Sequence, residues 1–256
     1  MFIDSHAHLD DEAIASREDE IAKAAKEAGV GVIINASSDL PSSLASVALA
    51  ERRKEVYAVI GVHPHEAKTY SDEVEREIVR LSKKEKVVAI GEIGLDYHYD
   101  LSPRDVQKAV LEREIVLAYE LKLPVVFHVR EAYEDFNEII ERNLSRFSHG
   151  CLLHCYSGSA ELAKYYSDRL DAYFSFGGVL TFAKHKDVVL KAIPKNRLLL
   201  ETDCPYMTPV PHRGEKNEPK YIPLIAEKMA ELTGLSLSEV EKITTENAIA
   251  FYNIRL

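Results

Sequence analysis

The sequence predicts an α/β fold of the (β/α)8 TIM barrel class. Short runs rich in β-branched residues alternate with amphipathic stretches of helical length from the first residues almost to the last, which is typical of a parallel sheet. There are eight such runs, and eight strands with intervening helices favour a closed barrel over an open sheet. The first run is not followed by the Gly-rich motif of a nucleotide-binding sheet, which argues against that alternative.

The expected strands are short apolar runs, each followed by a polar segment. In chain order they cover residues 2–6, 30–35, 56–62, 87–93, 124–129, 151–154, 172–176 and 197–203. The clearest expected helices between them are 16–28, 71–84, 104–121 and 131–143. Two further helices near 219–233 and 238–251 are expected to seal the barrel, and a capping box beginning at Ser236 or Ser238 would open the second. The segment 205–219 is the longest stretch without expected secondary structure, and loops of that length are often functional.

Length and composition fit one barrel domain spanning residues 1–256. No apolar run approaches the roughly 20 residues of a membrane span, so we expect no membrane partner. The first residues lack the basic and apolar regions of a secretory signal, which predicts a cytoplasmic protein. The net charge of -10 argues against a protein that coats long nucleic acids, although cations bound in a pocket would reverse the local charge. No sequence feature indicates an obligate protein partner.

Side chains that commonly bind metals gather at the carboxyl ends of the expected strands, where barrel enzymes carry their chemistry. They are His6, His8, His63, His65, Glu92, His128, His154, Glu201 and Asp203. Each has an ordinary alternative as a strand-end or buried group with satisfied hydrogen bonds. A histidine or carboxylate in an apolar strand is costly to desolvate, however, and a shared cation would offset that cost for several at once. Together they indicate a divalent metal centre.

These motifs resemble those of the TatD family of metal-dependent deoxyribonucleases, a branch of the amidohydrolase-like barrels. The similarity extends from the first strand to the last helix, through DSHAHLD (4–10), GVHPHEA (61–67), GEIGLDYH (91–98), PVVFHVREA (124–132), LLHCYSGS (152–159), FSFGGVLTF (174–182) and LLLETDCPYMTPVPHRG (198–214). The resemblance implies a hydrolase with two divalent cations, which are Mg2+, Mn2+ or Zn2+. Glu92 stands where the wider amidohydrolase group often has a carboxylated lysine, which favours this family.

The resemblance also implies a role for each ligand and a substrate. His6 and His8 are expected to bind one cation, Glu92 to bridge both, His128 and His154 to bind the second, and Asp203 to bind the first while contacting the attacking water. The expected partner is single-stranded DNA, shortened from its 3′ end by hydrolysis of phosphodiester bonds.

Other residues have expected roles in catalysis and substrate binding. We expect Asp203 to orient the water and accept its proton, and Glu201 to orient a neighbouring ligand. His63 is expected to contact the scissile phosphate, with protonation of the leaving oxygen as its other possible role. Arg130 and Arg213 are candidates for holding a substrate phosphate in a forked contact, and a surface ion pair is the alternative for each.

Two rival functions stay open at the level of the residues. A metal-activated water would also attack a carbonyl, so an ester or amide hydrolase such as a D-aminoacyl-tRNA deacylase is an alternative; some proteins similar to the family are assigned that activity. A barrel that only binds its ligand is the second alternative. Such a protein is expected to have lost a metal ligand, and none is missing here.

Overall fold

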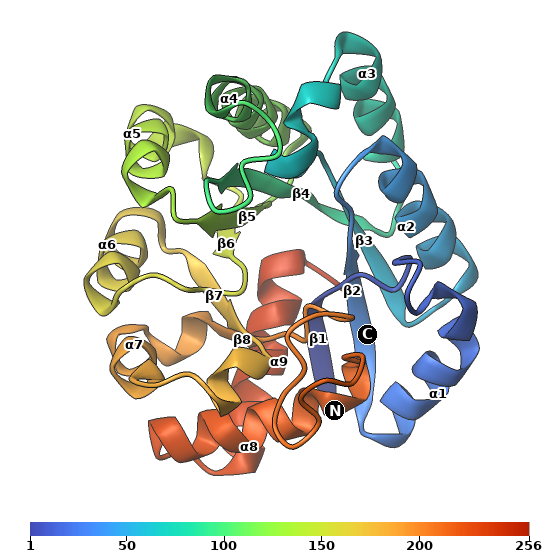
Figure 1. The fold of residues 1–256 in the computed structure, drawn as a ribbon, viewed down its shortest axis with the longest axis vertical. Coiled ribbons are helices and arrows are strands. Elements are labelled where there is room, and N and C mark those ends of the chain that lie inside the picture. The colour runs from blue at the N-terminus through green and yellow to red at the C-terminus, as the bar shows by residue number, and fades with distance from the viewer. Residues whose placement is uncertain (256) are drawn as a thin grey trace.

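Eight parallel strands pair in chain order, so that neighbours in the sequence are also neighbours in the sheet. The computed structural model describes residues 1–255. The strands are β1 (Phe2–Ala7), β2 (Val30–Ala36), β3 (Val56–Ile60), β4 (Val87–Asp96), β5 (Val125–Arg130), β6 (Cys151–Leu153), β7 (Tyr173–Phe176) and β8 (Leu198–Leu200). Figure 1 looks down the ring that they form, with helices around the outside. The predicted TIM barrel and its eight strands are confirmed.

The ring closes between β8 and β1 through the residues that follow β8. The backbone N–H of Asp203 donates to the carbonyl oxygen of His6 at 2.9 Å, and the N–H of His8 donates to the carbonyl oxygen of Cys204 at 2.8 Å. The expected strand 197–203 is too long at its end, because Asp203 has a left-handed backbone with φ of 55° and cannot continue an extended chain. The barrel is therefore closed at the level of the candidate metal ligands.

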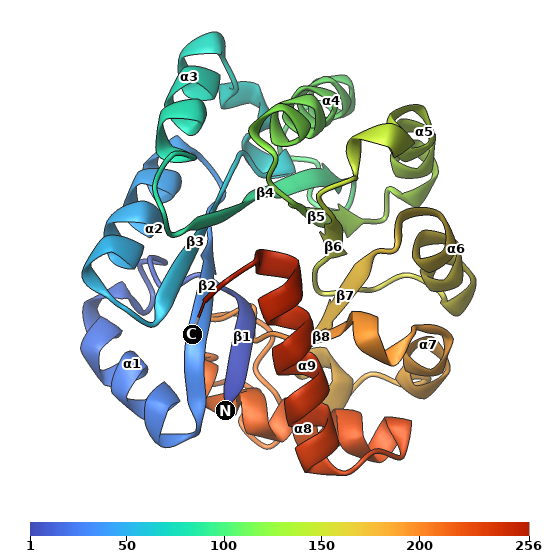
Figure 2. The ribbon, with the colours of Figure 1, turned by 180° about the vertical axis from the view of Figure 1, so that it is seen from behind.

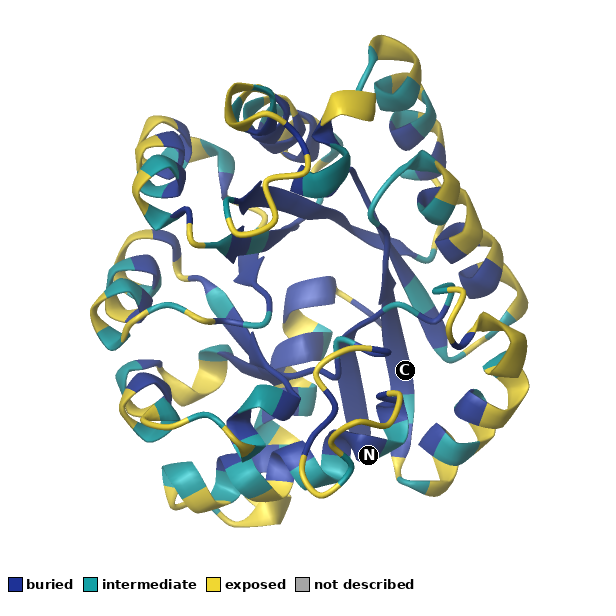
Figure 3. Ribbon diagram, viewed as in Figure 1, coloured by how far each residue is buried: buried dark blue, intermediate teal, exposed yellow. Residues whose placement is uncertain are grey.

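The helices that cover the outside of the barrel present buried faces inward and exposed faces outward (Figure 3). They are α1 (Glu18–Glu27), α2 (Leu40–Arg52), α3 (Asp72–Leu81), α4 (Arg104–Leu121), α5 (Tyr133–Asn143), α6 (Ala160–Leu170), α7 (Lys186–Ala192) and α8 (Ile222–Thr233). Short 3-10 turns lie at Ala15–Arg17, Pro64–Thr69, Leu144–Arg146, Gly178–Thr181, Lys195–Arg197 and Pro219–Tyr221. Within residues 1–255, none of the helices has the length and apolar character needed to span a membrane.

The last helix, α9 (Leu237–Tyr252), lies across one end of the barrel (Figure 2). Of the two capping boxes that the sequence offers, the one between Ser236 and Glu239 forms. Phe251 and Tyr252 pack into the apolar cluster that fills the barrel interior, and the hydroxyl of Tyr252 donates to the carbonyl oxygen of Ser5 at 2.8 Å. This apolar plug seals the end of the barrel opposite the polar side chains described next. Of the two helices expected to seal the barrel, α9 does so, whereas α8 packs on the outside.

Candidate metal centre

Glu92, near the middle of β4, lies between two groups of histidines with one carboxylate oxygen towards each. Its Oε1 is 3.3 Å from Nε2 of both His6 and His8. Its Oε2 is 2.8 Å from Nε2 of His154 and 3.6 Å from Nδ1 of His128. Ligands bound tetrahedrally at about 2.0–2.2 Å from a cation lie about 3.4 Å from one another. The two oxygens of Glu92 are therefore spaced to serve two separate cations.

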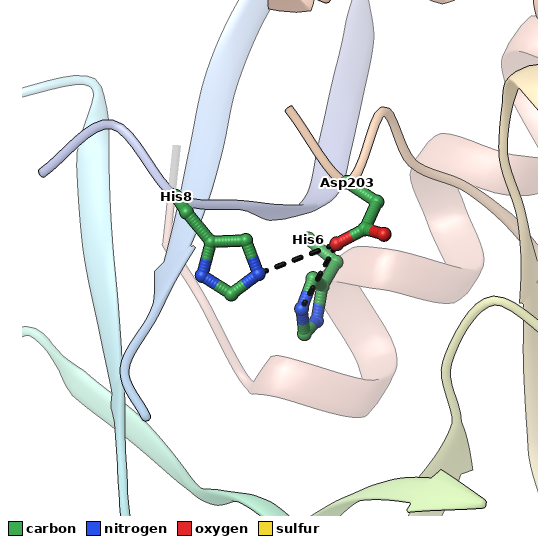
Figure 4. Close-up of side chains that lie close together, drawn as sticks. All are labelled: His6, His8 and Asp203. Atoms are coloured by element: carbon green, nitrogen blue, oxygen red, sulfur yellow. Dashed lines mark ion pairs between the residues drawn. The ribbon is translucent and has the colours of Figure 1, made fainter. Parts of the chain in front are cut away.

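The first candidate position lies among His6, His8 and Asp203 (Figure 4). Nε2 of His8 is 3.3 Å from Oδ1 of Asp203, and Nε2 of His6 is 4.0 Å from the same oxygen. Nδ1 of His8 lies 3.0 Å from the carbonyl oxygen of Ala36, and since a carbonyl only accepts, the ring proton belongs on Nδ1. Burial opposes a second proton on His8, but Asp203 and Glu92 raise its pKa to about 10, so a cation at Nε2 would displace that second proton and take up the lone pair.

His6 shows most clearly that this set of donors fits a metal. Its side chain is fully buried, yet neither ring nitrogen has a hydrogen-bond partner within residues 1–255. Buried polar atoms are rarely left without a partner, because the lost hydration costs free energy. A cation beside Nε2 would supply that partner. Imidazole nitrogens mixed with carboxylate oxygens suit Zn2+ and Mn2+, and the carboxylates also suit Mg2+.

The second candidate position lies among Glu92, His128 and His154. It adjoins the first, because His6 forms a cluster of possible ligands with Glu92 and His154, and its ring stacks on that of His154 with the ring centres 4.0 Å apart. Nδ1 of His128 and Nε2 of His154 are 3.1 Å apart and both face Oε2 of Glu92. The other nitrogen of His128 is 3.0 Å from Oδ2 of Asp96. A carboxylate behind a histidine fixes its tautomer and makes the facing nitrogen a better ligand. Burial opposes a second proton on His128, but Asp96 and Glu92 raise its pKa, so a cation would displace the proton on Nδ1 and bind the lone pair that faces His154 and Glu92.

Asp96, which holds His128, was not identified from the sequence as a separate site residue. It ends β4 and accepts hydrogen bonds at 3.0 Å from Nε2 of both His65 and His128, and at 2.8 Å from the backbone N–H of Tyr99. Burial opposes its ionisation, but the hydrogen bonds from His128 and His65 outweigh burial and hold the pKa of Asp96 below its usual value. Asp96 follows Glu92 at an even spacing, which places both side chains on the same face of a strand. This spacing was the signal available in the sequence.

His63 lies close enough to Glu92 and His128 to complete a third cluster of possible ligands. Its Nδ1 accepts a hydrogen bond from the backbone N–H of His65 at 3.1 Å, so the neutral ring carries its proton on Nε2. Nε2 is the atom that faces Glu92, at 4.0 Å. Burial, followed by the charge of His128, holds the pKa of His63 well below its usual value, so the ring is neutral. In this tautomer His63 is a hydrogen-bond donor towards the centre.

The two carboxylates nearest the candidate cations are ionised. Burial opposes ionisation of Glu92, but the charges of His6 and His154 outweigh it and hold the pKa of Glu92 well below its usual value. Burial likewise opposes ionisation of Asp203, but a hydrogen bond and the charge of His8 lower its pKa. Both groups therefore have the charge that a ligand of a divalent cation needs.

Glu201 lies behind the centre, where its Oε2 is 3.9 Å from Nδ1 of His154 and accepts a hydrogen bond from the hydroxyl of Ser175. Burial raises the pKa of Glu201 to about 7, partly offset by the charge of His154. Its Oε1 is buried without a hydrogen-bond partner among the described residues. At 3.9 Å the contact between Glu201 and His154 is too long for a hydrogen bond, so Nδ1 of His154 is buried without a partner among the described residues. Glu201 belongs to none of the clusters of possible ligands found among those residues.

The two predicted phosphate-binding arginines occupy different places. Arg130 ends β5 and lines a cavity of about 520 Å³ that opens over the centre, with its guanidinium 4.9 Å from the centre of the Tyr99 ring. Arg213 is exposed, donates to the carbonyl oxygen of Thr208 at 2.8 Å and lies 4.1 Å from the centre of the Phe182 ring. The structure thus brings Arg130 to the centre, whereas Arg213 stands away from the cavities described here.

Two adjoining cavities open over the centre. The larger, of about 520 Å³, is lined by residues from the loops after β1, β2, β3, β4 and β8, and the smaller has a volume of about 270 Å³. Both are lined by His128, Arg130, His154, Asp203 and Met207. The candidate ligands are therefore accessible from a space large enough for a small molecule or for part of a polymer.

The fold and the centre define the class of the molecule. It is a metal-dependent hydrolase on a TIM barrel, with its ligand-type side chains at or near the carboxyl ends of parallel strands and Glu92 within β4. Within that class, the chain belongs to the family of TatD-related DNases, whose family model matches residues 3–253.

Similar proteins align with the chain almost from end to end. The uncharacterized metal-dependent hydrolase YabD of Bacillus subtilis (strain 168) is 43% identical and aligns over 99% of this chain and 100% of its own length. The 3′-5′ ssDNA/RNA exonuclease TatD of Pantoea vagans (strain C9-1) is 32% identical over 98% of this chain and 99% of its own. The crystal structure of YjjV, a TatD homolog from Escherichia coli K12, has a TM-score of 0.92 at 29% identity and covers 99% of this chain and 98% of that one. The predicted family and the predicted hydrolase class are confirmed.

Proposed function

We propose that this hydrolase is a deoxyribonuclease that shortens single-stranded DNA from its 3′ end with two divalent cations. The observation that carries the proposal is the position of Glu92, whose two carboxylate oxygens face two separate sets of ligand-type nitrogens at 2.8–3.6 Å. A pair of cations about 3.5–4 Å apart suits in-line displacement at phosphorus. The name of the similar Pantoea vagans protein, a 3′-5′ ssDNA/RNA exonuclease, supports the same substrate class.

The proposed ligands are those expected from the sequence. His6, His8 and Asp203 would hold one cation, His128 and His154 the other, and Glu92 would bridge the two. When bound, the cations lower the pKa of a water molecule and neutralise charge on the phosphate. Mg2+, Mn2+ and Zn2+ all fit this mixed set of donors.

The side chains around the cations would each handle one part of the reaction. The water oxygen bonds to phosphorus while the bond from phosphorus to the leaving oxygen breaks. Ionised Asp203 takes the proton of the water, and this proton then passes to the leaving oxygen, which departs as a hydroxyl group. Nε2–H of His63 donates to a phosphate oxygen, where a fixed donor stabilises the charge that develops in the transition state. Arg130 holds a neighbouring phosphate. Glu201 would orient His154 through charge, from 3.9 Å behind its ring.

The replacement Glu92→Ala tests the proposal directly. A single-stranded oligonucleotide labelled at its 5′ end should be shortened stepwise by the native protein with Mg2+ or Mn2+, and the variant should show at least about a thousandfold loss because the bridge is gone. Metal analysis should find about two cations per native chain and fewer in the variant, with circular dichroism unchanged.

The same preparation separates the nuclease from the ester or amide hydrolase that the sequence leaves open. D-aminoacyl-tRNA is assayed beside the oligonucleotide under identical metal conditions. Cleavage of the aminoacyl ester with no shortening of any DNA would reject the nuclease, and so would full nuclease activity in Glu92→Ala.

A further inference from the structure

Two exposed tyrosines line the larger cavity from different loops. Tyr99, just after β4, and Tyr206, in the loop after β8, each have 54% of their surface exposed. Both line the cavity of about 520 Å³ that also contains Glu92 and His63. Single exposed aromatic residues are common on protein surfaces and need no explanation. Two that line the cavity over a candidate catalytic centre are instead placed to contact a substrate.

Tyr206 is held on the side of the first candidate cation. Its backbone N–H donates to the carbonyl oxygen of Asp203 at 2.9 Å, and its hydroxyl donates to Oδ2 of Asp11 at 2.7 Å. The centre of its ring is 6.2 Å from that of His8. The ring is therefore fixed at both ends, while its exposed surface is left free for another planar group.

Tyr99 is held on the opposite side of the cavity, beside His65. Its backbone N–H donates to Oδ1 of Asp96 at 2.8 Å, and its ring centre is 5.4 Å from that of His65. The guanidinium of Arg130 lies 4.9 Å from the ring centre. Within residues 1–255, Arg130 has no carboxylate within ion-pair distance, so its charge is available to an anion.

We propose that Tyr99 and Tyr206 stack against unpaired nucleobases of the substrate and so make the enzyme select single-stranded over duplex DNA. This inference rests on the nuclease function proposed above. A base in a duplex has both faces covered by its neighbours, whereas a base in a single strand offers a face to an aromatic ring. Arg130, beside Tyr99, supplies the positive charge that the intervening phosphate needs.

The test compares an ordinary single-stranded oligonucleotide with an abasic one of the same length. The native protein should have a kcat/KM about tenfold or more higher on the ordinary strand. Tyr99→Ala and Tyr206→Ala should each lose about tenfold on that strand and change little on the abasic one. Tyr99→Phe and Tyr206→Phe keep the ring and should retain the native preference.

A matched control and a binding measurement complete the design. Tyr119→Ala removes a tyrosine that is 44% exposed on α4 and lines neither cavity over the centre, so it should behave as the native protein. Fluorescence anisotropy with a single-stranded phosphorothioate oligonucleotide should show the same loss of affinity in the two alanine variants. The two variants should also prefer the single strand over a blunt duplex less than the native protein does.

Equal cleavage of ordinary and abasic strands by the native protein would overturn the stacking role while leaving the nuclease function intact. An equal loss on both strands in the alanine variants would also overturn it, since that pattern indicates damage to the centre. A native protein that hydrolyses no nucleic acid would reject the proposed function and this inference together.

Discussion

His63 illustrates how the hydrogen bond at one ring nitrogen decides what the other can do. Proximity alone would make it a metal ligand together with Glu92 and His128. The hydrogen bond from the backbone N–H of His65 to Nδ1 instead puts the proton of the neutral ring on Nε2. An imidazole nitrogen that carries its proton has no lone pair for a cation, so we assign His63 to the substrate.

The replacement His63→Ala distinguishes these two roles. Loss of one fixed donor to the phosphate should lower kcat by about a hundredfold. The number of cations bound per chain should stay as in the native protein, because no ligand is removed. Metal analysis and steady-state kinetics on the same preparation are the measurements. A variant that binds one cation fewer would instead make His63 a ligand.

Asp96 is a positioning residue whose effect should appear in metal affinity. The replacement Asp96→Asn keeps the shape but removes the charge that holds His65 and His128. We expect the affinity for Mn2+ to fall by about 10- to 100-fold, as is typical when the partner behind a ligand is lost. Isothermal titration calorimetry with Mn2+ gives the affinity. The control is Asp100→Asn, at an exposed ion pair with Arg104, which should bind Mn2+ as the native protein does. Equal affinity for Mn2+ in both variants would contradict the positioning role of Asp96.

At the level of single residues, the sequence predicted which side chains gather but not how each one is oriented. His6, Glu92 and Asp203 are recognisable because polar side chains stand in or beside apolar strands that end at one rim. Their roles as ligands remain predictions. The tautomer of His63 and the support from Asp96 depend on hydrogen bonds between segments distant in the chain, which no local pattern encodes.

Among the elements, β4 carries both Glu92 and Asp96, and its close approach to β5 sets their distance from His128. Gly94 lies between the two acids with φ of 153°, and a Cβ there would fall 1.8 Å from the carbonyl oxygen of His128. Only glycine fits this contact, because backbone atoms of the paired strand cannot move aside cheaply. The glycine thus fixes the spacing between the two strands at the centre.

The replacement Gly94→Ala should therefore damage stability and metal binding together. Gly29→Ala is the matched control, because Gly29 also has a positive φ of 82° but nothing within 4 Å of the added Cβ. We expect the control to lose about 1–2 kcal/mol of unfolding free energy from backbone strain alone, and Gly94→Ala to lose more and to bind Mn2+ weakly. Urea unfolding measures the unfolding free energy, and calorimetry measures the affinity for Mn2+. Equal losses in the two variants would show that the contact with β5 does not matter.

The positions of the strands could be predicted, because helical segments separate their apolar runs. The residues at which the strands end could not be predicted. The expected strand 197–203 stops at Leu200 in the structure, since the carboxylate of Asp4 accepts the backbone N–H of Thr202 at 2.9 Å and Asp203 turns left-handed. The helix 104–121 was predicted with its observed bounds. Side-chain contacts to the backbone decide such ends, and they involve residues from the opposite end of the chain.

On the scale of the whole molecule, the barrel separates an apolar end, filled by α9, from a polar end that carries the centre. One buried acid belongs neither to the apolar end nor to the metal centre. Glu114, on α4, is completely buried, and its Oε1 accepts the backbone N–H of Val62 at 2.8 Å, directly before His63. Its Oε2 has no partner among the described residues. Burial raises the pKa of Glu114 well above its usual value, with only the Val62 hydrogen bond opposing it.

Glu114 should therefore make the stability of the whole fold depend on pH. The folded state retains the proton that the unfolded state loses above its ordinary pKa of 4.5. The stability that this proton contributes is fully present below pH 4.5 and is lost as the pH rises towards the folded pKa, at about 1.4 kcal/mol per pH unit. The replacement Glu114→Gln removes that loss, because a neutral amide keeps the acceptor for Val62 and has no proton to lose.

Urea unfolding between pH 4 and pH 8 measures this difference. The variant and the native protein should unfold alike at about pH 4, and the variant should become the more stable of the two as the pH rises. Glu112→Gln is the control on the same helix, because Glu112 is exposed and pairs with Arg142 at 2.7 Å. Exposed pairs contribute about 0–1 kcal/mol, so this variant should follow the native curve throughout. Parallel curves for Glu114→Gln and the native protein would mean that Glu114 is ionised in the folded barrel, with a cation or water at Oε2.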